Sequence, residues 1–348
     1  MDAPGLKPGA PTTPQARGLH PGLHVPNRWL DVSLATDERN GVRPPRDLAE
    51  ARASCEQRRM GHVLGVIGGS GLYSLDGLVD VREEQVETPW GAPSDAIVRG
   101  RLGDVELLFL PRHGRGHRVS PSGVNYRANL AALKKLGATH VLAVSAVGSM
   151  KEEIAPGHLV VVDQYIDLTR RRTPTFFSYD GASDLGAPVA HVMYADPVCP
   201  LLAAAVHEAA VETGSVVHRG GTYVCIEGPQ FSTRAESLVY RSWGVSVIGM
   251  TSATEAKLAR EAELPFATLA LATDYDCWHE THEDVTVEQV VAVMKANVDR
   301  AKSTIAALSR RLPDPTKSIA NGALRGAVMT DMATVSAEVR ERYRLLLG

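Results

Sequence analysis

Two short segments, far apart in the chain, combine residue types that could bind and cleave a small substrate. Residues 63–71 read VLGVIGGSG, an apolar strand that breaks into a glycine turn, where backbone N–H groups and the Ser70 hydroxyl can face an anion. Residues 272–278 read ATDYDCW and place two carboxylates, Asp274 and Asp276, at the end of another apolar strand. The first segment suits phosphate and the second suits a base that bears an amino group. Together they favour an enzyme that acts on a nucleoside with inorganic phosphate.

Polar groups that suit phosphate also follow other predicted strands. Arg112 and His113 come directly after an apolar run, and an Arg fork beside an imidazole can bind an anion with charge assistance. Ser145 and Thr251 stand near the ends of two more strands. Because the carboxyl ends of strands are where α/β sheets bind ligands, we expect these groups to line one site. The alternatives are a purely structural turn at residues 68–71 and a surface histidine at 113.

A second group of residues suits a purine. Phe231, with Ser232 beside it, follows a predicted strand and could stack on a purine face, although an ordinary core phenylalanine is the alternative. Adenine presents an N6 donor and an N7 acceptor, so Asp276 can accept from N6 while a protonated Asp274 serves N7. We expect the two aspartates to share a strand face, where their proximity would raise one pKa. Solvated loop aspartates are the alternative.

From residue 63 onward, short β-rich runs alternate with helical patterns, which predicts an α/β fold in which helices cover both faces of a sheet. The predicted strands are residues 63–67, 105–110, 140–146, 158–163, 222–226, 245–249 and 266–272. The predicted helices are residues 125–136, 199–213, 233–243, 252–263 and 286–311. The stretch 170–198 is too long for an ordinary connection and is interpreted as a functional loop.

The two ends of the chain differ from this pattern. Residues 1–60 repeat Pro, Gly, Arg and His without a helical or strand period, which predicts a disordered extension. Met60 directly precedes the first strand, so we hypothesise that the working domain, residues 61–312, begins there. Residues 313–348 form a C-terminal extension in which a helical pattern returns near the end. That helix could cover the site as a lid, pack on the core or fray.

Composition excludes several classes of protein. A net charge of −3 and a pI near 6.5 provide no basic face for nucleic acid. No apolar run is long enough for a membrane span or a secretory signal. The four cysteines are widely separated, which argues against a disulfide framework and against a zinc site. We therefore expect a cytoplasmic protein. His279 and His282 are three residues apart, one short of the H-E-x-x-H metal motif, so we expect no metal.

A series of strings between residues 62 and 311 narrows these expectations. They read VIGGSGLY, TPWGAPSDAIVRG, PRHGRGH, NYRANL, SAVGSMKEEIAPG, IEGPQFSTRAES and ATDYDCW. In this order the chain resembles the trimeric nucleoside phosphorylases, and within them the 5′-methylthioadenosine phosphorylases. The resemblance implies a single-domain nucleoside phosphorylase fold with a central mixed β-sheet flanked by helices on both faces. It also implies a pentosyltransferase that uses inorganic phosphate as co-substrate and needs no cofactor.

The resemblance also implies roles for individual residues. The residues that match the phosphate shell are Ser70, Arg112, His113, Ser145, Ala146 and Thr251. Those that match the purine pocket are Phe231, Ser232, Asp274 and Asp276, and Met250 matches the residue beneath the ribose. The wall that accepts a methylthio group is matched by Val287, Val290 and Val291. His191 matches a residue that a neighbouring subunit of a homotrimer supplies.

The implied reaction is phosphorolysis of 5′-methylthioadenosine to adenine and 5-methylthioribose 1-phosphate, as in methionine and purine salvage. Relatives that prefer 6-oxopurines carry Glu and Asn where this chain has Ser232 and Asp274, which favours adenine. Phosphorolysis of 5′-methylthioinosine or other 6-oxopurine nucleosides is the alternative, and a hydrolase or a catalytically silent nucleoside-binding protein are more distant ones. The chain departs from the family pattern at Ser70, Gly249 and Thr254, where Thr, Asn and Pro are common.

Overall fold

The computed structural model describes residues 61–348 except 70, 73, 178–185 and 280–286, and the side chains of residues 287–291 are likewise not described. The N-terminal extension predicted at residues 1–60 therefore lies outside the described residues. So does Ser70, the predicted hydroxyl of the glycine turn.

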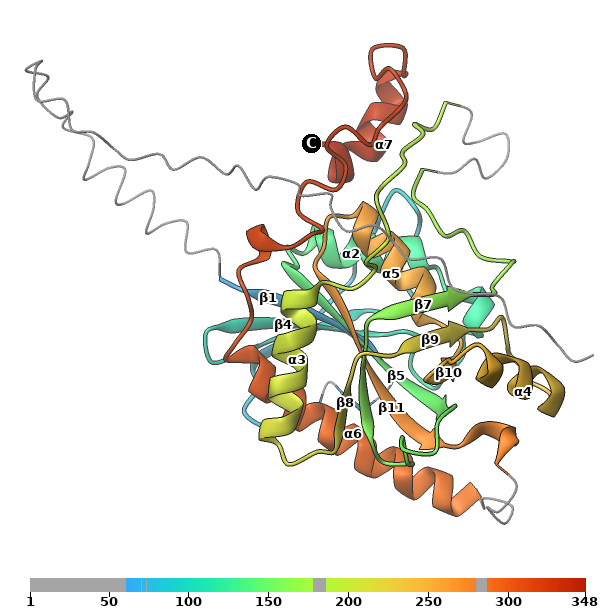
Figure 1. Ribbon diagram of the computed structural model, residues 1–348. Helices are drawn as coiled ribbons and strands as arrows, with labels where there is room; N and C mark the ends of the chain where they lie inside the picture. The colour runs from blue at the N-terminus through green and yellow to red at the C-terminus, as the bar shows by residue number, and fades with distance from the viewer. Residues whose placement is uncertain (1–60, 70, 73, 178–185, 280–286) are drawn as a thin grey trace, which may run out of the picture. The chain divides into compact units, whose positions relative to one another are not determined.

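Strands of the described residues form one mixed, eleven-stranded sheet (Figure 1). The strands are β1 (Val63–Gly68), β2 (Val79–Glu84), β3 (Ile97–Leu102), β4 (Val105–Pro111), β5 (His140–Ser149), β6 (Leu159–Val162), β7 (Gln164–Asp167), β8 (Val217–Arg219), β9 (Thr222–Cys225), β10 (Val247–Gly249) and β11 (Phe266–Asp274). They pair in the order β2-β3-β4-β1-β5-β10-β9-β7, while β11 joins β5 to β6 and β6 continues to β8. Strand β5 is central because it pairs with β1, β10 and β11.

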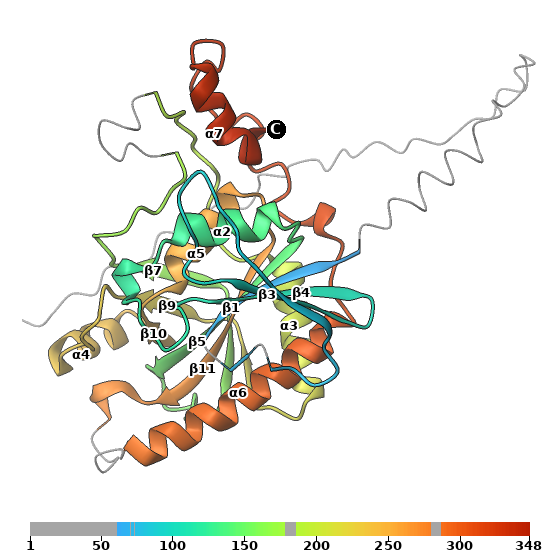
Figure 2. The ribbon, with the colours of Figure 1, turned by 180° about the vertical axis from the view of Figure 1, so that it is seen from behind.

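Helices cover both faces of this sheet, as predicted (Figures 1 and 2). The helices are α2 (Tyr126–Lys135), α3 (Pro200–Glu212), α4 (Arg234–Ser242), α5 (Ser252–Glu261), α6 (Val287–Ser309) and α7 (Ala337–Leu347). Helices α3 and α6 pack together against one face, and α2 and α5 lie against the other. The prediction of an α/β fold with a mixed sheet between helical layers is confirmed.

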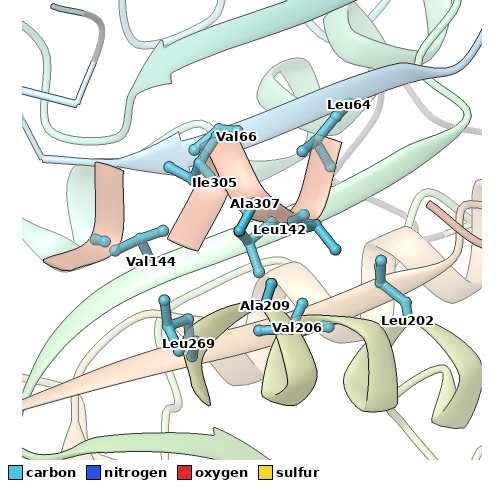
Figure 3. Packing of buried hydrophobic residues seen from close by; sticks show 14 of the residues in the cluster. Leu64, Val66, Leu142, Val144, Leu202, Val206, Ala209, Leu269, Ile305 and Ala307 are labelled. Carbon is cyan, nitrogen blue, oxygen red and sulfur yellow. The ribbon is translucent and has the colours of Figure 1, made fainter. Parts of the chain in front are cut away.

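The core explains why the central strands are apolar at nearly every position. Side chains alternate along a strand, so a strand covered on both faces must be hydrophobic throughout. Leu142 and Val144 of β5 point into the α3/α6 layer, whereas Val141 and Ala143 point into the α2/α5 layer. Figure 3 shows the first layer, in which side chains from β1, β5 and β11 meet α3 and α6. Its labelled members are Leu64, Val66, Leu142, Val144, Leu202, Val206, Ala209, Leu269, Ile305 and Ala307.

Strands β2, β3, β7 and β8 were not predicted, because their sequences carry little of the apolar signal used to find the others. Strand β2 reads VDVREE, lies at the edge of the sheet and is largely exposed. Strand β8 has only three residues, and β7 has four. Short or edge strands gain their pairing partners from the fold rather than from a local pattern. The predicted strand at 245–249 is also shorter, since β10 begins at Val247.

The C-terminal segment runs back along the α2/α5 side of the domain. The N–H of His191 donates to the Ala327 carbonyl at 2.9 Å, and the N–H of Met329 donates to the Val189 carbonyl at 2.8 Å. Helix α7 then buries Tyr343, whose hydroxyl donates to the Phe176 carbonyl at 2.9 Å. The segment thereby holds the residues on either side of 178–185. Among the described residues, no helix has the length and apolar character that crossing a membrane requires.

Candidate active site

Strand β5 connects the two groups of residues that the sequence singled out. Near the middle of this strand, Nη1 of Arg112 donates to the Val144 carbonyl at 3.0 Å. Near its carboxyl end, a Cβ placed on Gly148 would lie 3.1 Å from Oδ1 of Asp274. Four residues of a strand span about 13 Å, at roughly 3.3 Å per residue. The phosphate-type and base-type residues are therefore separated by a distance that a nucleoside and a phosphate can fill.

The middle of β5 is open on one side. Ala146 is exposed, although Ser145 and Val147 on either side of it are buried. In a central strand covered by helices, such an exposed position shows that the sheet is open to solvent at Ala146, an opening that we call the cleft. Strand β10 runs antiparallel to β5, pairing Val247 with Ser149, and so carries the chain that follows it back toward Ser145. The predicted phosphate residues Ser145 and Thr251 thus lie beside this opening.

Arg112 is less available to an anion than the sequence suggested. Its guanidinium is buried, and Glu255 of α5 accepts from Nε at 2.5 Å and from Nη2 at 3.0 Å. The carbonyls of Val144 and Ile67 accept two more N–H groups, so four of the five donors are occupied. Burial alone would lower the pKa of Arg112, but the Glu255 carboxylate raises it above its usual value. The charge is permanent, and one Nη1 N–H remains for a ligand.

His113 is half-buried, and its surroundings favour the neutral imidazole. Its Nδ1 lies 2.8 Å from the Val119 carbonyl, and because a carbonyl can only accept, Nδ1 carries the proton. Burial, followed by the charge of Arg112, lowers the pKa of His113 to about 4. The ring also stacks on His117, with centroids 4.4 Å apart. Nε2 therefore carries a lone pair, which can accept a hydrogen bond from phosphate or from a sugar hydroxyl.

Ser145 and Thr251 face each other across Tyr223. The Tyr223 hydroxyl lies 3.4 Å from Oγ of Ser145 and accepts a hydrogen bond from the backbone N–H of Thr251. Thr251 is also the N-cap residue of α5, yet its side chain makes no capping bond. The Thr251 hydroxyl is thus not used for capping and stands at the start of a ten-residue helix, whose N-terminus favours an anion.

Asp274 is a partly buried carboxyl that accepts from two donors. Oδ2 accepts from the Thr273 hydroxyl at 2.7 Å, and Oδ1 accepts from the N–H of Asp276 at 2.8 Å. Burial raises the pKa of Asp274 despite these hydrogen bonds, and the charge of Asp276 contributes less. The predicted direction is confirmed, but its main cause is desolvation rather than the neighbouring carboxylate. Asp274 is thus prepared to carry a proton.

Asp276 does not share a strand face with Asp274, so that expectation is wrong. Strand β11 ends at Asp274, and Asp276 begins a short 3-10 turn, η3 (Asp276–Trp278), with a left-handed φ of 52°. Its Oδ2 accepts from the Ser237 hydroxyl at 2.5 Å and from the Ser232 hydroxyl at 3.1 Å. The carboxylate is held as an acceptor at the rim of the cleft, and the alternative of solvated loop aspartates fails for both residues.

The remaining predicted residues lie in different places. Phe231 is 85% exposed, so it is not a core residue and its ring is available to a flat ligand. The Met250 carbonyl accepts from the buried side chain of Arg172. His191 is exposed beside Ala327, and no described contact joins it to the cleft of its own chain. Val287, Val290 and Val291 lie in the first turns of α6, but their side chains, like Ser70, are outside the described residues.

Comparison with known proteins identifies the family. Residues 63–310 match the Phosphorylase superfamily. This chain belongs to that superfamily. The match covers β1 to the end of α6 and leaves the C-terminal segment with α7 beyond it. The family predicted from the sequence strings is therefore confirmed.

Two curated members of the phosphorylase superfamily are similar over nearly their whole length. The S-methyl-5′-thioadenosine phosphorylase of Geobacter sulfurreducens is 57% identical over 290 residues, which is 83% of this chain and 99% of that protein. The S-methyl-5′-thioadenosine phosphorylase of Koribacter versatilis is 49% identical over 285 residues, covering 82% of this chain and 95% of that protein.

Solved structures agree with this assignment. A methylthioadenosine phosphorylase from an antarctic soil metagenomic library matches with a TM-score of 0.77 and 45% identity, over 83% of this chain and all of that one. The methylthioadenosine phosphorylase of Schistosoma mansoni in complex with adenine matches with a TM-score of 0.70 and 36% identity, over 77% of this chain and 99% of that one. The superfamily's fold is thus shared across the described domain.

Four residues of this superfamily member were missed by sequence reasoning and are supplied by the fold. They are Glu255, which holds Arg112; Ser237, which holds Asp276; Tyr223, between Ser145 and Thr251; and Arg172, beneath Met250. Each acts through a contact between segments distant in the chain, for which a single sequence carries no local signal. Within the described residues, no cluster of three or more His, Cys, Asp or Glu side chains is arranged to hold a metal ion.

Proposed function

We propose that this protein catalyses phosphorolysis of 5′-methylthioadenosine, giving adenine and 5-methylthioribose 1-phosphate. The observation that carries the proposal is the opening on β5, which has anion-binding groups around Ser145 and, beside Gly148, a carboxyl of raised pKa, Asp274 of β11. Gly148 lies about 13 Å along β5 from Val144, which contacts Arg112. The named relatives and structural neighbours support the same reaction. Methionine and purine salvage is the metabolic setting in which this reaction belongs.

The phosphate enters at the end of the cleft nearest Arg112. The remaining Nη1 N–H of Arg112, the hydroxyls of Ser145 and Thr251 and the N-terminus of α5 supply its donors. Neutral His113 accepts a hydrogen bond from phosphate through Nε2. Held there, phosphate attacks C1′ with inversion while the sugar develops oxocarbenium character, which the nearby anion stabilises.

The purine leaves at the other end of β5. As the glycosidic bond breaks, electrons move onto the base, and a proton delivered to N7 completes its departure as neutral adenine. Asp274 supplies that proton because burial raises its pKa. Asp276 accepts from the N6 amino group, and Phe231 stacks on the ring. An oxo group at C6 would place an acceptor against the Asp276 carboxylate, a mismatch that costs roughly 1 to 3 kcal/mol.

Other parts of the proposal extend this chemistry. The protein works as a homotrimer in which His191 of one subunit closes the 5′ side of the sugar in the next, and Val287, Val290 and Val291 accept the methylthio group. Burial of an apolar CH₃–S group there contributes on the order of 1 to 2 kcal/mol. The residues described as forming the site supply all the acid, base and anion-binding groups used, so no cofactor enters the scheme. Free thiols at Cys199, Cys225 and Cys277 fit a cytoplasmic protein.

Product analysis tests the reaction directly. The full chain is incubated with 5′-methylthioadenosine with and without phosphate, and adenine and the sugar product are quantified. We expect adenine release only with phosphate, together with 5-methylthioribose 1-phosphate. Adenine release without phosphate would identify a hydrolase, and binding without release would identify a silent nucleoside-binding protein.

The Asp274→Asn variant tests the base assignment in the same assay. An amide cannot deliver the proton to N7, so activity on 5′-methylthioadenosine should fall about 100-fold or more. Activity on 5′-methylthioinosine should fall far less, because an amide can pair with a 6-oxopurine. Equal losses on the two substrates, or a wild type that prefers 5′-methylthioinosine, would reject the adenine assignment.

A further inference from the structure

Helix α4 rests on the turn that carries Asp276. The buried residues of this helix are Ser237 and Tyr240, while most of its other positions are exposed. Four residues after Ser237, the guanidinium of Arg241 lies 3.4 Å from the centre of the Trp278 ring. Positions i and i+4 share one face of a helix. A single face of α4 therefore contacts both ends of η3.

The start of α4 is also well defined. Thr233 is its N-cap: the Thr233 side chain accepts from the N–H of Glu236, and the Glu236 carboxylate accepts from the N–H of Thr233 in return. This reciprocal capping box fixes where the helix begins, and hence where Ser237 stands one turn later. The position of the Ser237 hydroxyl thus follows from local sequence and from packing on η3 together.

Ser237 determines the orientation of the Asp276 carboxylate. The Ser237 hydroxyl donates to Oδ2 at 2.5 Å, and the Ser232 hydroxyl donates to the same oxygen at 3.1 Å. Ser232 approaches Oδ1 only at 3.5 Å. Ser237 is fully buried, so it does not itself meet a ligand. With Oδ2 occupied by two donors, Oδ1 is the oxygen left to accept a hydrogen bond from a ligand.

We infer that Ser237 is a positioning residue that makes Asp276 select an amino group over an oxo group at C6 of the purine. The inference rests on the proposed function, in which Asp276 faces that edge of the base. The backbone of Asp276 is already fixed by its N–H bond to Asp274, so the remaining freedom is rotation of the carboxylate. Ser237 removes that freedom and keeps a lone pair of Oδ1 directed at the N6 donor. A 6-oxopurine gains nothing from this arrangement.

The test compares two substrates in the wild type, two Ser237 variants and one control variant. The kcat/KM values for 5′-methylthioadenosine and 5′-methylthioinosine are measured with phosphate for wild type, Ser237→Ala and Ser237→Cys. The control is Ser242→Ala, an exposed serine at the end of the same helix whose hydroxyl bonds only to the Val239 carbonyl. We expect the adenine substrate to lose about 10-fold in both Ser237 variants, and the hypoxanthine substrate less than about 3-fold. The control should retain wild-type values for both.

Binding of the free bases gives a readout that is independent of turnover. Calorimetric titration with adenine and with hypoxanthine should show adenine affinity falling about 10-fold in Ser237→Ala while hypoxanthine affinity is retained. Ser237→Cys keeps the buried volume with a weaker donor, so it supplies the same comparison should the alanine variant fail to fold. An unchanged ratio between the two substrates, or equal losses on both, would overturn the inference. A wild type that releases no base with phosphate would instead reject the proposed function.

Discussion

Glu255 holds the guanidinium of Arg112 with both of its carboxylate oxygens, and both side chains are almost completely buried. A buried carboxylate beside the anion site repels phosphate, yet it also orients the cation. Its role is to fix the guanidinium plane and satisfy two donors that would otherwise lack partners in the interior. The remaining Nη1 N–H then has a fixed direction. Because Glu255 balances the charge of Arg112, Arg112 contributes to phosphate binding through this oriented donor rather than through net charge.

Substitution of Glu255 should therefore lower the stability of the protein and also weaken phosphate binding. Glu255→Gln leaves a buried guanidinium without its counter-charge, and breaking a buried pair in this way costs about 3 to 5 kcal/mol. We expect a loss of that size in the free energy of unfolding by urea, and a higher KM for phosphate. The control is Glu208→Gln, whose carboxylate is exposed and lies 4.0 Å from Arg311. A stable Glu255→Gln variant that binds phosphate more tightly would contradict this role.

Glu261 should make stability depend on pH. Burial raises the pKa of Glu261 to about 7, although the Thr175 hydroxyl and the Phe176 N–H donate to its carboxylate. The folded state then holds a proton that the unfolded chain releases near its ordinary pKa of about 4.3. The stability that this proton gives the folded state is fully present below that value and is lost as pH rises through about 7. The free energy of unfolding of Glu261→Gln, relative to that of wild type, should therefore rise by about 3 kcal/mol between pH 4 and pH 8.

Urea unfolding of both proteins at several pH values measures this difference. Because other groups titrate identically in the two proteins, only the difference between their free energies of unfolding is compared. A constant difference across the range would show that Glu261 does not take up the proton.

Substitution of Thr254 by an apolar residue of similar shape should stabilise the folded protein. The Thr254 side chain is fully buried in the first turn of α5, and within the described residues its hydroxyl has no hydrogen-bond partner. Thr254→Val keeps the shape and removes the unsatisfied group, so we expect about 1 kcal/mol of added stability in thermal or urea unfolding. Thr304→Val is the matched control, because the buried Thr304 hydroxyl donates to the Arg300 carbonyl at 2.8 Å. That variant should lose stability, and the same sign of change in both would refute the explanation.

Gly249, where the family commonly has Asn, is explained by Tyr223. A Cβ on Gly249 would lie 2.0 Å from the Tyr223 hydroxyl oxygen and 2.6 Å from Cζ. Gly249→Ala should therefore lower the free energy of unfolding by about 1 to 3 kcal/mol through overpacking. It should also disturb the hydrogen bond that the Thr251 N–H donates to the Tyr223 hydroxyl. In a Tyr223→Val background the same substitution should cost much less. Additive effects in the double-mutant cycle would show that the two positions do not compete for space.

The fold class, the family and the segments that carry the chemistry can all be predicted from the amino-acid sequence. Apolar runs such as Val63–Gly68 and Phe266–Asp274 specify strands through local periodicity, and short strings specify the turns that follow them. Asp274 was recognised for the same reason, since its place at a strand end is a local property. Predictions of this kind succeed because propensity, pattern and turn chemistry act over a few residues.

The chemical properties of the site residues, in contrast, depend on contacts that form on folding. Arg112 meets Glu255 across 143 positions of sequence, and Asp276 meets Ser237 across 39. His113 is neutral because the interior that buries it disfavours its charge. The hydrogen-bond partners and the burial of a side chain are set when segments distant in the sequence pack together. Its pKa and the direction of its lone pairs therefore depend on tertiary packing rather than on the adjacent residues in the sequence.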